Sequence, residues 1–300
     1  MRQRIHLRFG RSRVTGLISA EEVRDLLHIR REVDLLVLRQ HRTLVEVIEL
    51  RLEGLDVGLI RRRDYVGDLL DGLLHQAWDS FDGNVALQAE GEPPLDCSRG
   101  CAACCTLRVT AIAPEVLAVA RFLRAVEPAL KARGIDLIAQ VRAADAETAG
   151  LGESERVGLR QRCPFIAQGV CVIYRVRPLA CRGHASHDRH ACAAAAAGRA
   201  QEVPFSRTHH LVRALVQNAL QSALRDARLE WGAYELNRAL CLAFDRAEAL
   251  QPTQPALGQR QLEAAWLEGD DVLAGAQVSE VDRAEMAKVF DALKGTVSPA

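Results

Sequence analysis

The hydrophobic and polar positions of this chain predict helices over most of its length. In the first ninety residues, apolar residues recur at helical spacing between about residues 19 and 54 and again from Tyr65 to Phe81. The second stripe ends at Asp82-Gly83-Asn84, a sequence typical of a turn. We therefore expect two helices that form a hairpin and pack on the rest of the chain or on a second copy.

More helices are expected beyond this hairpin. One opens at about Pro114, a residue favoured in the first turn of a helix. Three further amphipathic patterns cover about residues 206–230, 233–250 and 279–294, and Gln251 to Pro255 separates the last two. The stretch from 135 to 162 is polar and only weakly helical, so we interpret it as a spacer.

Two segments depart from the helical pattern. Residues 97–109 have no regular period and predict a loop, whereas residues 163–174 place β-branched and aromatic residues on both sides of Gln168-Gly169, which is typical of a hairpin. The fold class is therefore mainly α, with helical segments flanking a small irregular cysteine-rich module that contains a short β-hairpin. We expect three regions: an N-terminal helical region over 1–90, the cysteine module over 91–192, and a C-terminal helical region with a disordered tail over 193–300.

Composition excludes several classes of protein. The 39 lysines and arginines balance 39 aspartates and glutamates, so no overall charge attracts nucleic acid or anionic lipid. No run of about 18 apolar residues occurs, so no membrane span is expected. The chain has 300 residues, is 49% hydrophobic and lacks a signal-peptide pattern at its start. We expect a cytoplasmic protein with a large core and reduced thiols.

The cysteines give the strongest chemical signal. Seven of the nine form two groups, one from Cys97 to Cys105 and one from Cys163 to Cys181. Disulfide frameworks belong mainly to small secreted domains without a core of their own, which this chain is not. A tetrahedral metal site takes four thiolates or imidazoles, commonly as close pairs that the fold brings together. We therefore expect a bound soft or borderline metal ion, and the two groups must meet in space.

Seven thiols exceed the needs of one mononuclear site. Either a multinuclear cluster forms or some thiols have a redox or supporting role, and the adjacent Cys104 and Cys105 are expected to face different sides. Four thiolates on zinc, or around a four-iron cluster, leave a net charge of about −2 that needs compensation. Four arginines near the cysteines are expected to provide it unless they are only surface residues: Arg108, Arg175, Arg177 and Arg182.

Two further features contain metal-ligating residue types. His184, His187 and His190 precede Cys192, and two of the imidazoles with Cys192 would complete a metal site, whereas an exposed histidine-rich loop is the alternative. Their role stays open. Cys241 lies in an apolar helical stretch without a neighbouring thiol, and we expect it to be a small core residue.

The spacing Cys97-x3-Cys101-x2-Cys104 also occurs in radical S-adenosylmethionine enzymes, but those enzymes continue as a βα barrel, and this chain has no βα alternation. Four segments, together with Thr110 to Glu115, give a more specific match: Cys97 to Cys105, Cys163-Pro-Phe-Ile, Cys171-Val-Ile-Tyr and Arg177 to Arg182. In these segments the sequence closely resembles the YkgJ-type cysteine-cluster family, described as a zinc- or iron-chelating domain. The resemblance covers only about residues 97 to 185.

This resemblance implies a metal or iron–sulfur site, with Arg177, Pro178 and Arg182 as companions of the ligands. The implied ligands are Cys97, Cys101, Cys104, Cys105, Cys163, Cys171 and Cys181. The family includes domains related to flagellin lysine N-methylases, so the resemblance also permits methyl transfer, although no glycine-rich strand-to-helix motif of a conventional methyltransferase is present.

We expect a protein that binds zinc or iron, including iron as a 4Fe-4S cluster, in a structural, redox or metal-handling role. One alternative is an iron–sulfur-dependent methyltransferase that uses S-adenosylmethionine and acts on protein lysine. Another is an interaction scaffold in which the metal staples the module. The sequence leaves open whether the protein is an enzyme, which protein it acts on or binds, and its oligomeric state.

Overall fold

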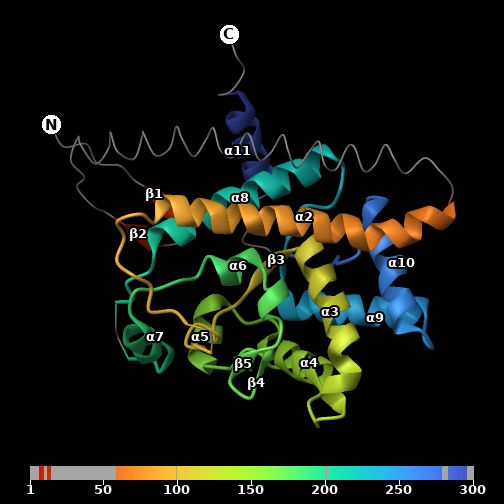
Figure 1. Ribbon diagram of the computed structural model, residues 1–300, viewed down its shortest axis with the longest axis horizontal. Helices are drawn as coiled ribbons and strands as arrows, with labels where there is room; N and C mark the ends of the chain where they lie inside the picture. The colour runs from red at the N-terminus through yellow and green to blue at the C-terminus, as the bar shows by residue number, and fades with distance from the viewer. Residues whose placement is uncertain are drawn as a thin grey trace.

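The computed structural model describes residues 7–9, 12–14, 59–98, 100–199, 202–278 and 283–295. Helices dominate this part of the chain and the strands are short, so the predicted mainly α fold class is confirmed. Figure 1 shows the long helix α2 (Leu59–Gln88) crossing the molecule beside α8 (Arg207–Asp226), with α5 (Glu153–Leu159) and α7 (Arg189–Ala196) on the other side of it. The helix expected between 19 and 54 and the tail after 295 lie outside the described residues.

The predicted second helix is present as α2, but its predicted end is wrong. Instead of stopping at the turn sequence 82–84, α2 continues to Gln88. Asn84 is 6% exposed and its side-chain amide donates to the Ser80 carbonyl over 2.7 Å, while Val85 packs against the core. Because α2 packs on α8 and on α10 (Pro255–Leu267), burial outweighs the local preference for a turn.

The core forms where α2 and α3 (Ala113–Lys131) meet α9 (Leu236–Leu250) and α10. The helix expected at Pro114 is confirmed as α3, whereas α10 was not predicted. Pro255 opens α10, and Trp266 is fully buried. A Cβ on Gly258 would lie 1.9 Å from the carbonyl oxygen of Ala247, so the close crossing of α9 and α10 requires glycine at this position.

A short antiparallel ladder joins the starts of α3 and α9. Strand β3 (Thr110–Ile112) pairs with β6 (Ala233–Glu235), with Ala111 opposite Tyr234. The N–H of Leu236 extends the ladder by donating to the Val109 carbonyl over 3.0 Å. Neither three-residue strand was predicted, because each is too short to show an alternating pattern.

The segment interpreted as a spacer is part of the core. Helix α4 (Leu137–Thr148) packs on α3 and α9 and buries Leu137, Ile138 and Val141. The following helix, α5, carries Arg156, which makes a buried ion pair with Glu235 of β6 over 2.9 Å. The spacer interpretation was wrong because one narrow apolar face is enough to bury a helix whose other faces are polar.

The predicted hairpin is confirmed in the cysteine module. Strand β4 (Ile166–Ala167) pairs with β5 (Val170–Cys171). Gln168 and Gly169 both have positive φ, 51° and 79°, as a two-residue hairpin turn requires. The 3₁₀ turn η1 (Tyr174–Val176) and the short helix α6 (Leu179–Arg182) follow. The remaining elements are the paired strands β1 (Leu7–Phe9) and β2 (Ser12–Val14) and the helix α11 (Arg283–Gly295).

Within the described ranges, no helix has the length and apolar character needed to cross a membrane.

Glu115 connects the helical core to the cysteine module. It lies in the first turn of α3 and is 1% exposed. One carboxylate oxygen accepts the N–H of Ile112 over 3.1 Å, and the other accepts the N–H of Leu179, at the start of α6, over 2.7 Å. Burial raises the pKa of this carboxyl, although both hydrogen bonds oppose the shift. The position of α6 therefore depends on a side chain of α3.

Replacing Glu115 with glutamine should destabilise the fold. A carboxamide has one acceptor oxygen, so its amino group would face one of the two N–H donors that the carboxylate now satisfies. We expect Glu115→Gln to lower the free energy of unfolding by about 1–3 kcal/mol, the usual cost of an unsatisfied buried polar group, as measured by urea denaturation. Glu127→Gln, on the partly exposed side of the same helix, should cost less than about 1 kcal/mol. Equal losses would contradict this role for Glu115.

Candidate metal centre

The first cysteine segment is a series of tight turns between α2 and β3, as the predicted loop requires. The N–H of Cys101 donates to the Ser98 carbonyl over 2.9 Å, and that of Cys105 donates to the Ala102 carbonyl over 3.1 Å. Gly100 has a φ of 94°, in the left-handed region that favours glycine. These turns keep the cysteines of this segment close to one another.

A backbone hydrogen bond joins the second group of cysteines to the first. The N–H of Cys163 donates to the carbonyl of Cys105 over 2.6 Å. The side chains also meet, because the Cys105 thiol is hydrogen-bonded to those of Cys104 and Cys163. The two groups, far apart in sequence, therefore come together as the spacing implied.

Cys171 and Cys181 complete this part of the cluster. Cys171 lies in β5 of the hairpin and Cys181 in α6. Negative charge on Cys171 raises the pKa of Cys105, and negative charge on Cys105 raises the pKa of Cys181. We refer to five thiols as the inner set: Cys104, Cys105, Cys163, Cys171 and Cys181. They come from the turns over residues 97–109, which we call the knuckle, from the hairpin and from α6. Three separate segments therefore contribute to one group of sulfurs.

Four of the inner thiols resist ionisation. The hydrogen bond with Cys105, followed by burial, strongly raises the pKa of Cys104. For Cys105, the bond with Cys104 lowers the pKa, but the bond with Cys163, burial and negative charge on its neighbours raise it to about 12. Burial likewise raises the pKa of Cys171 and of Cys181. Several thiolates can therefore share this space only when positive charge compensates them.

Arg177 supplies part of that charge. Its guanidinium lies 4.1 Å from the centre of the Tyr174 ring, and its charge lowers the pKa of Cys104, Cys171 and Cys181 against the effect of burial. The Nε atom of Arg177 is buried without a hydrogen-bond acceptor. An anionic sulfur beside it would satisfy this donor.

Arg182, which was expected to have the same role, instead holds the backbone before α6. Its guanidinium lies 4.4 Å from the centre of the Trp78 ring of α2. It donates to the carbonyl of Arg177 over 3.1 Å and to that of Arg175 over 2.9 Å. Arg182 therefore shapes the loop that positions Arg177, while the Arg175 residue itself is exposed.

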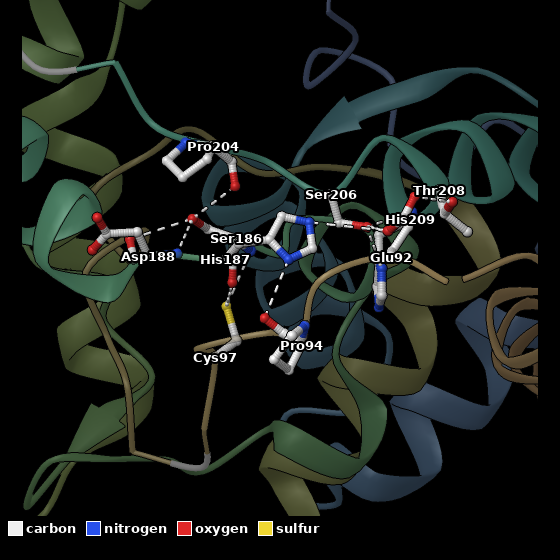
Figure 2. A network of polar contacts seen from close by, with 10 residues as sticks. All are labelled: Glu92, Pro94, Cys97, Ser186, His187, Asp188, Pro204, Ser206, Thr208 and His209. Atoms are coloured by element: carbon white, nitrogen blue, oxygen red, sulfur yellow. Dashed lines mark hydrogen bonds and ion pairs between the residues drawn. The ribbon is translucent and has the colours of Figure 1, made fainter. Parts of the chain in front are cut away.

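Three further cysteines lie at the edge of the inner set. The N–H of Ser186 donates to the sulfur of Cys97 over 3.2 Å, and the Cys97 thiol faces the Ser186 carbonyl at 3.6 Å (Figure 2). Burial raises the pKa of Cys97, and so does negative charge on Cys101, Cys104 and Cys192. We refer to Cys97, Cys101 and Cys192 as the outer set. Cys104 belongs to the inner set and also acts on Cys97 of the outer set.

Cys192 is the residue that the sequence left undecided and that the structure adds to the cluster. It lies in the first turns of α7, whose N-cap Asp188 accepts the N–H groups of His190 and Ala191 over 2.7 and 2.9 Å. An N-cap aspartate before an alanine-rich run was the available sequence signal for this helix. Together with the seven predicted residues, Cys192 brings the cluster to eight thiols.

The histidines before Cys192 make other contacts. The ring of His184 packs edge-on against Phe205 at 4.7 Å, and burial lowers its pKa. Nδ1 of His187 lies 3.3 Å from the Pro94 carbonyl, and Nε2 lies 3.9 Å from a carboxylate oxygen of Glu92 (Figure 2). His190 is exposed. These contacts secure the segment that follows Cys181.

The prediction that Cys241 is a packed core residue is confirmed. It is 4% exposed on α9 and belongs to the main hydrophobic core. Burial raises the pKa of its thiol to about 12.

The donor set of the cluster fits zinc or iron. All nine cysteines are free thiols, and sulfur is a preferred donor for both zinc and iron–sulfur clusters. The buried, unpaired Nε of Arg177 fits the negative charge that such a site carries. Among the described residues, no three cysteine, histidine or acidic side chains already have metal-ligand spacing around one point. Binding therefore requires the thiols to reorient as they lose their protons.

Comparison with known proteins identifies the same part of the chain. Residues 96–202, about a third of the sequence, match the CxxCxxCC family model, which is described as "Putative zinc- or iron-chelating domain". No curated protein and no solved structure matches the chain. The matched range contains all eight thiols of the inner and outer sets together with Arg177. Over residues 96–202, the chain is therefore similar to the CxxCxxCC family model.

Proposed function

We propose that residues 91–192 form a module that binds zinc or iron through thiolates of the inner and outer sets. The observation that carries this proposal is the gathering of eight free thiols from separate segments, with Arg177 acting on Cys104, Cys171 and Cys181. Neighbouring thiols and burial raise the pKa values of Cys104, Cys105 and Cys181, and a metal ion is the cation that can bind several thiolates at once.

We further propose that the module binds more than one metal ion or a multinuclear cluster such as 4Fe-4S. Eight thiols are twice the number that a tetrahedral zinc ion takes. Cys104 and Cys105 are adjacent, yet Cys105 interacts with Cys163 and Cys171, whereas Cys104 also acts on Cys97 of the outer set. This division favours two neighbouring centres with Cys104 at their boundary.

A structural role is favoured by the way the module is built. The ligand-bearing segments are turns, two-residue strands and the four-residue helix α6, which bury little apolar surface of their own. A metal would therefore supply much of the free energy that closes the module. Redox and metal-handling roles draw support from the exposed Cys97. The lysine methyltransferase alternative rests on the family resemblance alone.

Metal analysis provides the first test. We expect protein purified without oxygen to contain zinc or iron in an amount comparable to or above that of the chain. Visible absorption then separates the two metals, because zinc thiolate sites are colourless and iron–sulfur clusters are brown. Protein that contains neither metal, and that takes up neither on reconstitution, would refute the proposed function.

Two cysteine substitutions distinguish the cluster from the core. Cys171→Ala should reduce metal content or change the absorption spectrum, because it removes a thiol of the inner set. Cys241→Ala should keep full metal content and lower the free energy of unfolding by only about 1 kcal/mol, the cost of a small cavity. Metal content is measured by elemental analysis and stability by urea denaturation. Equal metal loss in both variants would show that this division of the cysteines is wrong.

Chelation should loosen the module but not the helical core. The free energy of metal binding to small structural zinc sites is about 10 kcal/mol, and the segments 97–109 and 163–183 have little else to hold them. We expect hydrogen exchange in these segments to accelerate when the metal is removed, while α3 and α9 remain protected. Unchanged exchange in the module would contradict a structural role for the metal.

A further inference from the structure

A pocket opens against the inner set, on the side where the module meets the core. The sulfur-bearing residues Cys105 and Cys163 line it, together with the end of α4, Arg156 of α5, and the start of α9. The space that it offers to a water-sized ligand is about 40 Å³, enough for a small ion of a few atoms, and the open mouth gives such a ligand access from solvent.

The lining of this pocket has a surplus of positive charge. Three arginines line it: Arg108, Arg156 and Arg162. The one lining carboxylate, Glu235, is paired with Arg156 over 2.9 Å, and both residues are buried. The charge of the exposed Arg162 therefore remains to favour an anion in the pocket.

Several hydrogen-bond donors at the pocket have no acceptor among the described residues. Nε of Arg156 is buried without an acceptor, although the terminal nitrogens of the same guanidinium bond to Glu235 and to the Thr148 carbonyl. The side chains of Arg162 and Asn237 make no hydrogen bond or ion pair to any described residue. A buried donor without an acceptor costs free energy, which a bound oxyanion would recover.

A different arginine acts on the thiols. The guanidinium that acts on Cys104, Cys171 and Cys181 is that of Arg177, which does not line the pocket. Arg162 is exposed at the mouth, on the segment between α5 and the hairpin. Its position suits capture of a ligand from solvent better than neutralisation of a buried sulfur.

We propose that this pocket binds a small carboxylate, held by Arg162 and the Asn237 amide beside Cys105 and Cys163. Guanidinium groups bind carboxylates through paired, charge-assisted hydrogen bonds, and a carboxamide adds a neutral donor. The bound carboxylate lies next to two thiols of the inner set. Its contact with a metal rests on the function proposed above, whereas binding of the anion itself does not.

Calorimetric titration of the protein as purified tests this site with defined probes: acetate, succinate, inorganic phosphate and acetamide. We expect acetate and succinate to bind and acetamide, which has the shape of acetate without its charge, to bind at least about tenfold more weakly. The carboxylates should also slow hydrogen exchange in residues 105–109 and 161–165, which border the pocket. Equal binding of acetate and acetamide, tighter binding of phosphate than of both carboxylates, or protection only elsewhere would overturn the proposal.

Two substitutions locate the site and one controls for charge. Arg162→Gln removes the positive charge at the mouth, and Asn237→Asp places a negative charge in the pocket at almost constant shape. Each should weaken acetate and succinate binding by about tenfold or more, the effect of one charge-assisted hydrogen bond. Arg133→Gln, which removes an exposed arginine after α3, should leave binding unchanged.

Thermal melts and metal analysis of each variant separate this site from the metal function. Loss of carboxylate binding with normal metal content supports the pocket assignment. Carboxylate binding that survives both pocket substitutions, or that Arg133→Gln weakens equally, would refute it even when the metal content is normal. A metal-free protein that still binds acetate would refute only the metal function.

Discussion

Mutual repulsion between thiolates is the constraint on which the cysteine module depends. Cys104, Cys105 and Cys181 are easier to keep protonated than to ionise, because neighbouring sulfurs and burial raise their pKa values. The fold nevertheless collects eight thiols, and it places Arg177 among them with a buried donor unused. Such an arrangement is costly as a set of free thiolates and favourable around a cation.

The helical core determines where the cysteine segments can lie. Glu115 links the first turn of α3 to α6, and the Arg156–Glu235 pair links α5 to the β3–β6 ladder. The N–H of Cys163 then joins the hairpin segment to the knuckle at Cys105. The module is thus attached to the core through α6 and α5, and the hairpin segment is attached to the knuckle. These contacts position the thiols approximately, and the metal binding proposed above would set their final orientation.

The sequence predicts the parts of this structure that have a long or distinctive pattern. The apolar stripe of α2, the proline at the start of α3 and the Gln168-Gly169 turn each gave the right element. The pattern failed where tertiary packing decided the outcome, as at the end of α2, where burial of Asn84 extends the helix through a turn sequence. The strands β3 and β6 could not be found because three residues show no period.

For the candidate site, the spacing of the cysteines predicted which of them lie together, but not which other residues contact them. The seven cysteines predicted from the sequence lie together, whereas Cys192 joins them only because α7 folds back beside Cys97. The roles of the arginines were not separable from sequence either. Arg177 and Arg182 are close neighbours in the chain, yet one faces the thiols and the other lies over Trp78. Side-chain direction in an irregular loop is set by contacts that no local pattern encodes.

The cluster and the pocket share two residues. Cys105 and Cys163 belong to the inner set and also line the pocket, and the 2.6 Å backbone bond between them holds both together. Reorientation of these thiols toward a metal must change the pocket surface that a ligand meets. By thermodynamic linkage, a ligand that prefers one arrangement of these thiols changes metal affinity by the same factor by which the metal changes ligand affinity. The two sites can therefore act as one unit although their polar groups, Arg177 for the sulfurs and Arg162 for the pocket, are distinct.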